Sequence, residues 1–134
     1  MPSIDAIEGV GIRNLAKLRR ARCRTTEALL KKGATRKDRT ALAAETGLST
    51  SDLRDWVNRA DLMRIKGIGT EYSDLLEEAG VDTIKALRRR NSVNLMNAME
   101  NINAKKRSVR RLPTQAMVAA WVDAARTLEP VVSY

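Results

Sequence analysis

Two short glycine motifs are the parts of this sequence best suited to hold a negatively charged group. They are residues 7–11, Ile-Glu-Gly-Val-Gly, and residues 65–69, Ile-Lys-Gly-Ile-Gly, and each precedes a helix-like run. An apolar residue between two glycines predicts a tight hairpin that buries the middle side chain. The first amides of a helix lack internal partners and lie at the positive end of the helix dipole. The pattern therefore predicts two phosphate sites, whose members are Gly9, Val10 and Gly11 in the first and Lys66, Gly67, Ile68 and Gly69 in the second.

The first motif has the more favourable charge around it. Residues 1–60 carry 13 basic and 7 acidic side chains. Arg13 and Lys17 are one helical turn apart, so they can contact neighbouring phosphates while the hairpin amides hold one phosphate oxygen. Glu8 lies within the hairpin and would repel a phosphate unless it turns away. The competing interpretation is a structural hairpin that only joins two helices.

The second motif is followed by an acidic helix, and for this copy the structural interpretation is preferred. Lys66 stands where the first motif has Glu8, and its positive charge favours an anion. Carboxylates near a helix start stabilise the helix but oppose nucleic acid. The acidic residues are Glu71, Asp74, Glu77, Glu78 and Asp82. Their face could instead contact a basic surface on a second molecule, which predicts a homodimer through the second copy.

A basic run in the second half is the third candidate for backbone binding. Residues 105–111 hold five cations and no acid, and we expect them on a loop, where no helix end explains the charge. The cations are Lys105, Lys106, Arg107, Arg110 and Arg111. Residues 88–90, Arg-Arg-Arg, end a short predicted helix and are interpreted as a solvated helix terminus.

The two halves of the chain align with each other. A shift of 58 positions (67 minus 9) superimposes the two glycine motifs and the apolar residues that follow, Leu18 on Leu76 and Leu29 on Leu87. Trp56 matches Trp121 at a shift of 65, so the second half carries about seven extra residues. We expect a tandem duplication, with residues 1–60 as the first copy and 61–134 as the second, which carries a basic insertion at about 103–113.

The glycine motifs and the residues that follow them resemble the helix-hairpin-helix family, and in particular a bacterial family of uncharacterised proteins built from such repeats. The resemblance spans nearly the whole chain. It implies that the hairpins hold a nucleic-acid backbone through phosphate. The sequence departs from the family where a small residue often follows the second glycine by four positions, because Leu15 and Ser73 stand there.

Composition supports an all-α protein with a polyanionic partner. The chain has 134 residues, no Phe, 3% aromatic residues and a formal charge of +9. With no His and a single Cys, it offers neither a His-based triad nor a standard zinc site, so we expect no cofactor, no metal and no catalytic residue. No apolar run reaches membrane-spanning length and no signal peptide is visible, which predicts a soluble cytoplasmic protein without a membrane partner.

Turn and cap residues predict where the helices lie. In the first half we expect helices over 11–22, 27–32, 36–46 and after Ser49, capped by Thr25 or Thr26, Thr35 and Ser49. In the second half we expect Asp82 to cap a helix over 83–89, Ser92 to cap the next helix, and 113–114 to begin the last one. The tail, residues 131–134, is apolar enough to dock on the body of the protein.

Together these observations predict an all-α fold of tandem helix-hairpin-helix units packed as one compact domain. We expect a non-enzymatic protein that binds nucleic acid, DNA more than RNA, through backbone phosphates and largely without regard to sequence. The alternative is a helical adaptor or self-assembling scaffold that uses the acidic face of the second copy.

Overall fold

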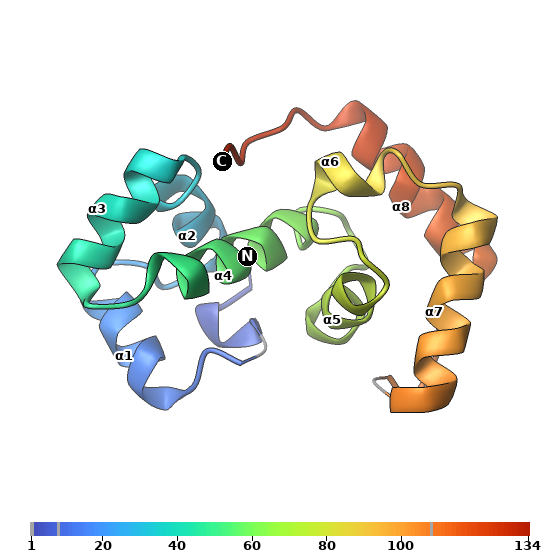
Figure 1. Ribbon diagram of the computed structural model, residues 1–134, viewed down its shortest axis with the longest axis horizontal. Helices are drawn as coiled ribbons and strands as arrows, with labels where there is room; N and C mark the ends of the chain where they lie inside the picture. The colour runs from blue at the N-terminus through green and yellow to red at the C-terminus, as the bar shows by residue number, and fades with distance from the viewer. Residues whose placement is uncertain (1, 8, 108) are drawn as a thin grey trace. The chain divides into compact units, whose positions relative to one another are not determined.

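The computed structural model describes residues 2–7, 9–107 and 109–134, and in these ranges the fold is all-α, as the composition predicted. The only β-type pairing among them is one bridge between Ser3 and Thr25. Figure 1 shows the order of the elements. They are η1 (Ile4–Ala6), α1 (Ile12–Arg20), α2 (Thr26–Lys32), α3 (Arg36–Thr46), α4 (Thr50–Leu62), α5 (Thr70–Glu78), α6 (Ile84–Leu87), α7 (Ser92–Lys106) and α8 (Gln115–Thr127).

The chain divides into two compact units. Unit 1 comprises Met1–Asp61 and Val131–Tyr134, and unit 2 comprises Leu62–Pro130. The division falls near the end of α4, so each unit begins with its own glycine motif after a short lead-in.

Three helices of unit 1, α2, α3 and α4, begin directly after residues whose side chains cap them. The hydroxyl of Thr25 accepts from the Ala28 amide at 3.1 Å, and that of Thr35 accepts from the Asp38 amide at 3.0 Å, as predicted. Ser49 caps α4 in the same way. Such caps satisfy amides that have no partner within the helix. The core that these helices enclose includes the fully buried side chains Ile4, Leu18, Cys23, Leu29, Leu53 and Val57.

The tail of the chain docks on unit 1, as its apolar residues predicted. The Ser133 amide donates to the Ala34 carbonyl at 2.8 Å, and the Tyr134 hydroxyl donates to Asn58 Oδ1 at 2.7 Å. The guanidinium of Arg39, which is buried, donates to the Ser133 carbonyl at 2.6 Å. The ring of Tyr134 lies 4.5 Å from the guanidinium of Arg54. The tail is thus held by main-chain and side-chain bonds together.

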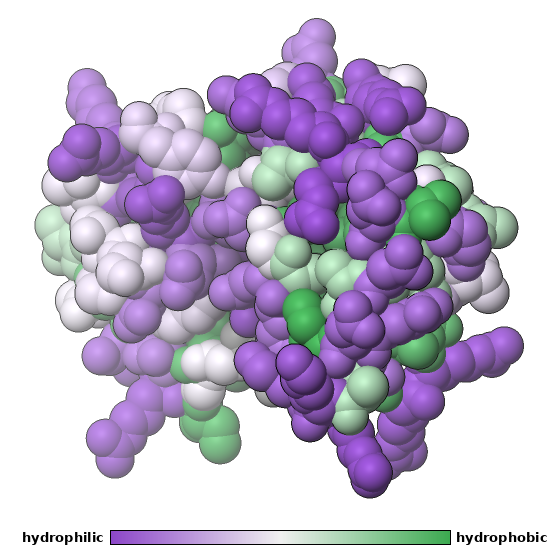
Figure 2. All heavy atoms as spheres, turned by 45° about the vertical axis from the view of Figure 1, so that its right-hand side comes forward, coloured by the Kyte–Doolittle hydropathy of each residue, from purple (hydrophilic) through white to green (hydrophobic). Residues whose placement is uncertain are grey.

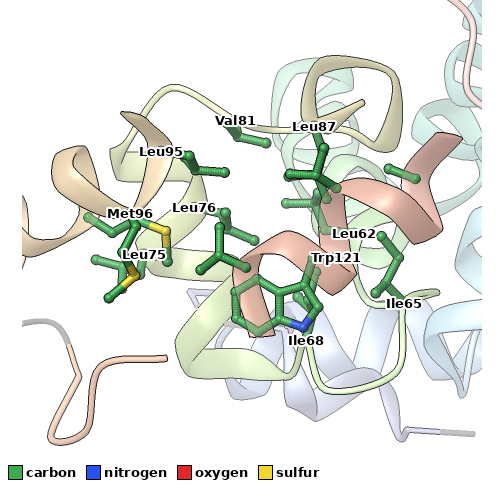
Figure 3. Packing of buried hydrophobic residues seen from close by; sticks show 14 of the residues in the cluster. Leu62, Ile65, Ile68, Leu75, Leu76, Val81, Leu87, Leu95, Met96 and Trp121 are labelled. Carbon is green, nitrogen blue, oxygen red and sulfur yellow. The ribbon is translucent and has the colours of Figure 1, made fainter. Parts of the chain in front are cut away.

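Unit 2 is organised around Trp121. Figure 3 shows the indole of α8 between the apolar side chains of the glycine motif, Ile65 and Ile68, and Leu75 and Leu76 of α5. Trp121 is 3% exposed, and Trp56 of unit 1 is 6% exposed, so both tryptophans are core residues. Tyr72 packs on Trp121 with ring centroids 5.3 Å apart. Aromatic pairs at this separation add to the stability that burial provides.

Two helix starts in unit 2 lie one residue from their predicted caps. Thr83, not Asp82, caps α6 by accepting from the Ala86 amide at 3.1 Å. Asn91, not Ser92, caps α7 by accepting from the amides of the second and third residues that follow it. In both places two adjacent residues have capping side chains, and the one that caps is the residue directly before the first helical residue, Ile84 or Ser92. The two predictions were therefore wrong by one position.

Several local bonds recur 58 residues later in the chain. The Cys23 amide donates to the Leu18 carbonyl at 2.9 Å, and the Val81 amide donates to the Leu76 carbonyl at 2.8 Å. The residue before each of these amides has a positive φ, 68° at Arg22 and 88° at Gly80. A long cation also closes each turn: Lys32 donates to the Ala21 carbonyl, and Arg90 donates to the Ala79 carbonyl at 3.1 Å.

Candidate nucleic-acid interface

The first glycine motif forms an open turn at the surface of unit 1. Val10 is 2% exposed and Ile7 is 3% exposed, so the apolar residues enter the core as predicted. Gly9 and Gly11 are exposed and adopt φ angles of 84° and 81°. A Cβ atom added at either glycine would meet nothing within 4 Å. Glu8, which we expected to oppose a phosphate, lies outside the described residues.

Helix α1 begins directly after this turn and has no side-chain cap among the described residues. Its first main-chain bond runs from the Leu15 amide to the Gly11 carbonyl at 2.9 Å. The amides of residues 12–14 precede that bond, and they lie where the helix dipole favours an anion. Asn14 Nδ2 donates to the Val10 carbonyl at 2.9 Å and holds the turn against the helix. Ile12, the first residue of α1, is 87% exposed.

A row of cations continues from the turn along α1. Arg13, Lys17 and Arg20 are all exposed, and their spacings of four and three residues place them on one helix face. None of the three forms an ion pair with another described residue. Figure 2 shows one face of the molecule, where hydrophilic side chains are mixed with intermediate and hydrophobic ones. The structure therefore joins Gly9, Gly11 and the cation row into one open basic surface of unit 1.

The second glycine motif has helix α8 packed behind it. Ile65 and Ile68 are each 4% exposed, and Lys66 is exposed. Gly67 has a φ of 95°, and a Cβ atom there would lie 3.2 Å from Nε1 of Trp121. Gly69 has a φ of −106°, which other residues adopt freely. This turn is therefore tied to the core of unit 2 in a way that the first turn is not.

The acidic helix after the second motif is less available than its sequence suggested. Of its carboxylates, Glu71 is exposed, whereas Asp74, Glu77 and Glu78 are half-buried. Each of these three takes part in an interaction within the chain. Their charges are thus partly used inside unit 2.

The basic run at 105–111 is only partly a loop, which corrects the sequence prediction. Helix α7 continues to Lys106, and Arg107 ends it with a φ of 51° and an amide bond to the Asn103 carbonyl at 2.8 Å. Lys105 and Lys106 therefore lie in the last turn, where cations favourably meet the exposed carbonyls of the helix. The charge of these two residues thus has a structural explanation that a loop would not provide.

The segment after α7 is anchored although its cations are exposed. The Val109 amide donates to Asn103 Oδ1 at 3.0 Å, and the Val109 side chain is buried. Tyr72 of α5 donates from its hydroxyl to the Arg111 carbonyl at 3.0 Å. The structure thus brings the end of the basic run beside the first turn of α5, while the side chains of Lys105, Lys106, Arg107, Arg110 and Arg111 stay exposed.

Three arginines bind carbonyl groups of their own chain, which the sequence analysis missed. Arg88 donates to the Leu128 carbonyl at 2.5 Å, and Arg90 closes the turn at Ala79. Residues 88–90 are therefore not simply a solvated helix end. Arg39 donates to the carbonyls of two residues before α3 and one in the tail, at 2.6–3.0 Å. Burial lowers the pKa of Arg39 from its ordinary value. The internal alignment could have identified the role of Arg90, because Lys32 lies 58 residues earlier and donates to the equivalent carbonyl.

Other kinds of site are not visible in the part of the chain that the structure describes. No three His, Cys, Asp or Glu side chains there gather closely enough to hold a metal ion. None of its helices combines the length and the apolar composition needed to cross a membrane. Cys23 is fully buried, and burial raises the pKa of its thiol.

The fold and surface define an all-α chain of two compact units, one of which carries an open basic turn. Residues 8–128 match a family model described as Domain of unknown function (DUF4332). Because the match covers most of the chain, the protein belongs to this family. Comparisons with curated proteins and with solved structures gave no match.

Proposed function

We propose that this protein is a non-enzymatic nucleic-acid-binding protein that grips backbone phosphates with the basic surface of unit 1. The proposal rests on one observation, that exposed cations directly follow a helix start without a side-chain cap. The amides at the start of α1 have no side-chain cap among the described residues, and the exposed Arg13 and Lys17 follow on one face of the helix. Amide donors and cations bind phosphate without reading bases.

We further propose that the chain is a tandem of two helix-hairpin-helix units, with the boundary near residue 60. The recurrence of cap, turn and carbonyl-binding interactions at a spacing of 58 residues supports this proposal. Thr25 and Thr83 cap with the same bond length, 3.1 Å, and Leu29 and Leu87 are both fully buried. The two copies then differ in use: the turn of unit 1 is open, whereas Trp121 lies behind the turn of unit 2.

A secondary phosphate contact is proposed at the exposed cations of the 105–111 segment. These five side chains carry no acid among them and stay exposed although Val109 anchors their backbone. Since Lys105 and Lys106 are explained in part by the helix end, we assign more of the binding to unit 1.

Salt-titrated binding of labelled DNA and RNA, single-stranded and duplex, tests the proposal. Affinity should fall steeply between about 50 and about 200 mM salt, since phosphate contacts release counterions. Arg13→Ala/Lys17→Ala should weaken binding to every nucleic-acid form and reduce the salt slope by about two. Lys105→Ala/Lys106→Ala should have a smaller effect.

The matched control is Arg36→Ala/Lys37→Ala. Both residues are exposed on α3 of the same unit, and the change in net charge is the same. This control should weaken binding less than the double substitution on α1. If no nucleic acid binds at low salt, the proposed function is wrong. A concentration-dependent dimer that Glu77→Lys/Glu78→Lys dissociates would support the adaptor alternative instead.

A further inference from the structure

A hollow of about 130 Å³ lies beside the cation row of unit 1, and one residue in it does not suit phosphate binding. The hollow is lined by Lys17 and Arg20 of α1, by Ala21, and by Glu45 and Thr46 at the end of α3. Two of these residues belong to the cation row. The third charged residue, Glu45, is a carboxylate that would repel a phosphate held there.

Glu45 is an exposed carboxylate in the last turn of α3. It forms no ion pair or hydrogen bond with another described residue, although four cations line the hollows on its two sides. The helix dipole disfavours a negative charge in that turn. The four cations favour a carboxylate in this place, whereas the helix dipole and a bound phosphate both oppose it.

The other polar groups of the hollow are already used. The Thr46 hydroxyl donates to the Leu42 carbonyl at 2.7 Å and accepts from the Leu48 amide at 3.2 Å. The Ala21 carbonyl accepts from Lys32. The groups left to meet a ligand are therefore two cations and one carboxylate.

Resting on the proposed function, we infer that this hollow receives the edge of an unpaired base and that the preferred ligand is single-stranded nucleic acid. An ionised carboxylate only accepts hydrogen bonds, and the base edges of a nucleic acid offer amino and imino donors. In a duplex the imino hydrogens and one hydrogen of each amino group pair with the other strand, and only the second amino hydrogen faces a groove. In a single strand the whole pairing edge is open to the protein. Lys17 and Arg20 hold the phosphates next to that base.

The lining also indicates how selective such a site is. No aromatic side chain lines the hollow, so a base is contacted at its edge rather than stacked on a ring. Every base has at least one N–H on its pairing edge, so a single carboxylate distinguishes unpaired from paired strands more than one sequence from another.

The test compares the affinities of a single strand and a duplex of equal length at one salt concentration. Wild-type protein should bind single-stranded DNA more tightly than duplex DNA. Glu45→Ala should lower the ratio of the two affinities by about tenfold, the lower end of what a hydrogen bond to a charged group contributes, because Glu45 is exposed. Its duplex affinity should rise, because a repelling charge is removed, while the single strand loses an acceptor.

Asp55→Ala is the matched control. Asp55 is an exposed carboxylate of α4 in the same unit and does not line the hollow. This change should raise both affinities equally and leave their ratio unaltered. An unchanged ratio in Glu45→Ala, or equal wild-type affinities, would overturn the inference while leaving the phosphate-binding proposal intact. An effect seen with RNA but not DNA would assign the donor to the ribose 2′-hydroxyl and overturn the base-edge assignment. If the wild type binds no nucleic acid at all, both proposals fall.

Discussion

Replacing Arg39 with methionine removes the guanidinium that connects the tail to the body of unit 1. One guanidinium nitrogen donates to the carbonyls of Gly33 and Ala34 at 2.8 and 3.0 Å, and the other donates to that of Ser133 at 2.6 Å. Methionine has a similar length and no donor, so the carbonyls of Gly33 and Ser133 lose the guanidinium, and the Ala34 carbonyl keeps only the Ser133 amide. The Arg39 side chain is buried, so only the carbonyls near the surface can take water instead.

The size of the effect follows from two opposing terms. A hydrogen bond to a charged group contributes about 1.5 to 3 kcal/mol. Burial of the guanidinium opposes this, as its lowered pKa shows, and two of the three bonds are only partly buried. We therefore expect a net loss of about 2 to 4 kcal/mol in the free energy of unfolding of unit 1. For a unit of this size the loss corresponds to about 10–25 °C in Tm.

Urea unfolding followed by circular dichroism measures the loss, and hydrogen exchange at the Ser133 amide locates it. That amide donates to the Ala34 carbonyl, so its protection should fall first when the tail is released. Arg36→Met is the control, because Arg36 is exposed on the same helix one turn earlier. If Arg39→Met and Arg36→Met unfold at the same urea concentration, the buried arginine does not hold the tail and the reasoning is wrong.

Two further predictions concern the glycine turns and the buried thiol. Both Gly67→Ala and Gly9→Ala force a positive φ on an L-residue, which costs about 1–2 kcal/mol. Gly67→Ala should lower the Tm more, because only its added Cβ atom also presses on Trp121. Equal losses of Tm in thermal unfolding would contradict this, because they would show that the indole moves aside without cost. Cys23 should react with a thiol reagent far more slowly in the folded chain than in urea, because it is buried and its pKa is raised. Because its pKa is raised in the folded chain, the thiol loses its proton at a lower pH in the unfolded chain than in the folded chain. The free energy of unfolding should therefore fall as the pH rises through the ordinary range of a thiol. Urea midpoints at several pH values will measure this fall, and Cys23→Ala should remove it.

Features set by a few neighbouring residues could be predicted from the sequence. The bounds of α3, Arg36–Thr46, and the cap at Thr35 agree with prediction, because a capping side chain and the amide that donates to it lie three residues apart. The caps of α6 and α7 were misplaced because Asp82 and Thr83, or Asn91 and Ser92, compete with similar side chains. Which of the two residues caps depends on where the helix begins, at Ile84 and at Ser92, and the side-chain types do not show this.

Features that join distant parts of the chain could not be predicted. Arg39 and Ser133 are 94 positions apart, and no periodicity or motif links them. The extra turn of α7 depends on Asn103, whose side chain holds the Val109 amide while Val109 fills a place in the core of unit 2. The sequence does not show that contact, and a run of cations before a proline by itself predicts a loop.

The two glycine turns show why a motif alone does not identify a binding site. Both motifs bury their apolar residues and both precede a helix without a side-chain cap. What differs is what lies behind and beside each turn. Gly67 lies against the indole of α8 and is followed by carboxylates, whereas Gly9 has open space around it and is followed by Arg13 and Lys17. A ligand that needs both free amides and cations therefore favours unit 1, and substitutions there should weaken binding more than the equivalent ones in unit 2.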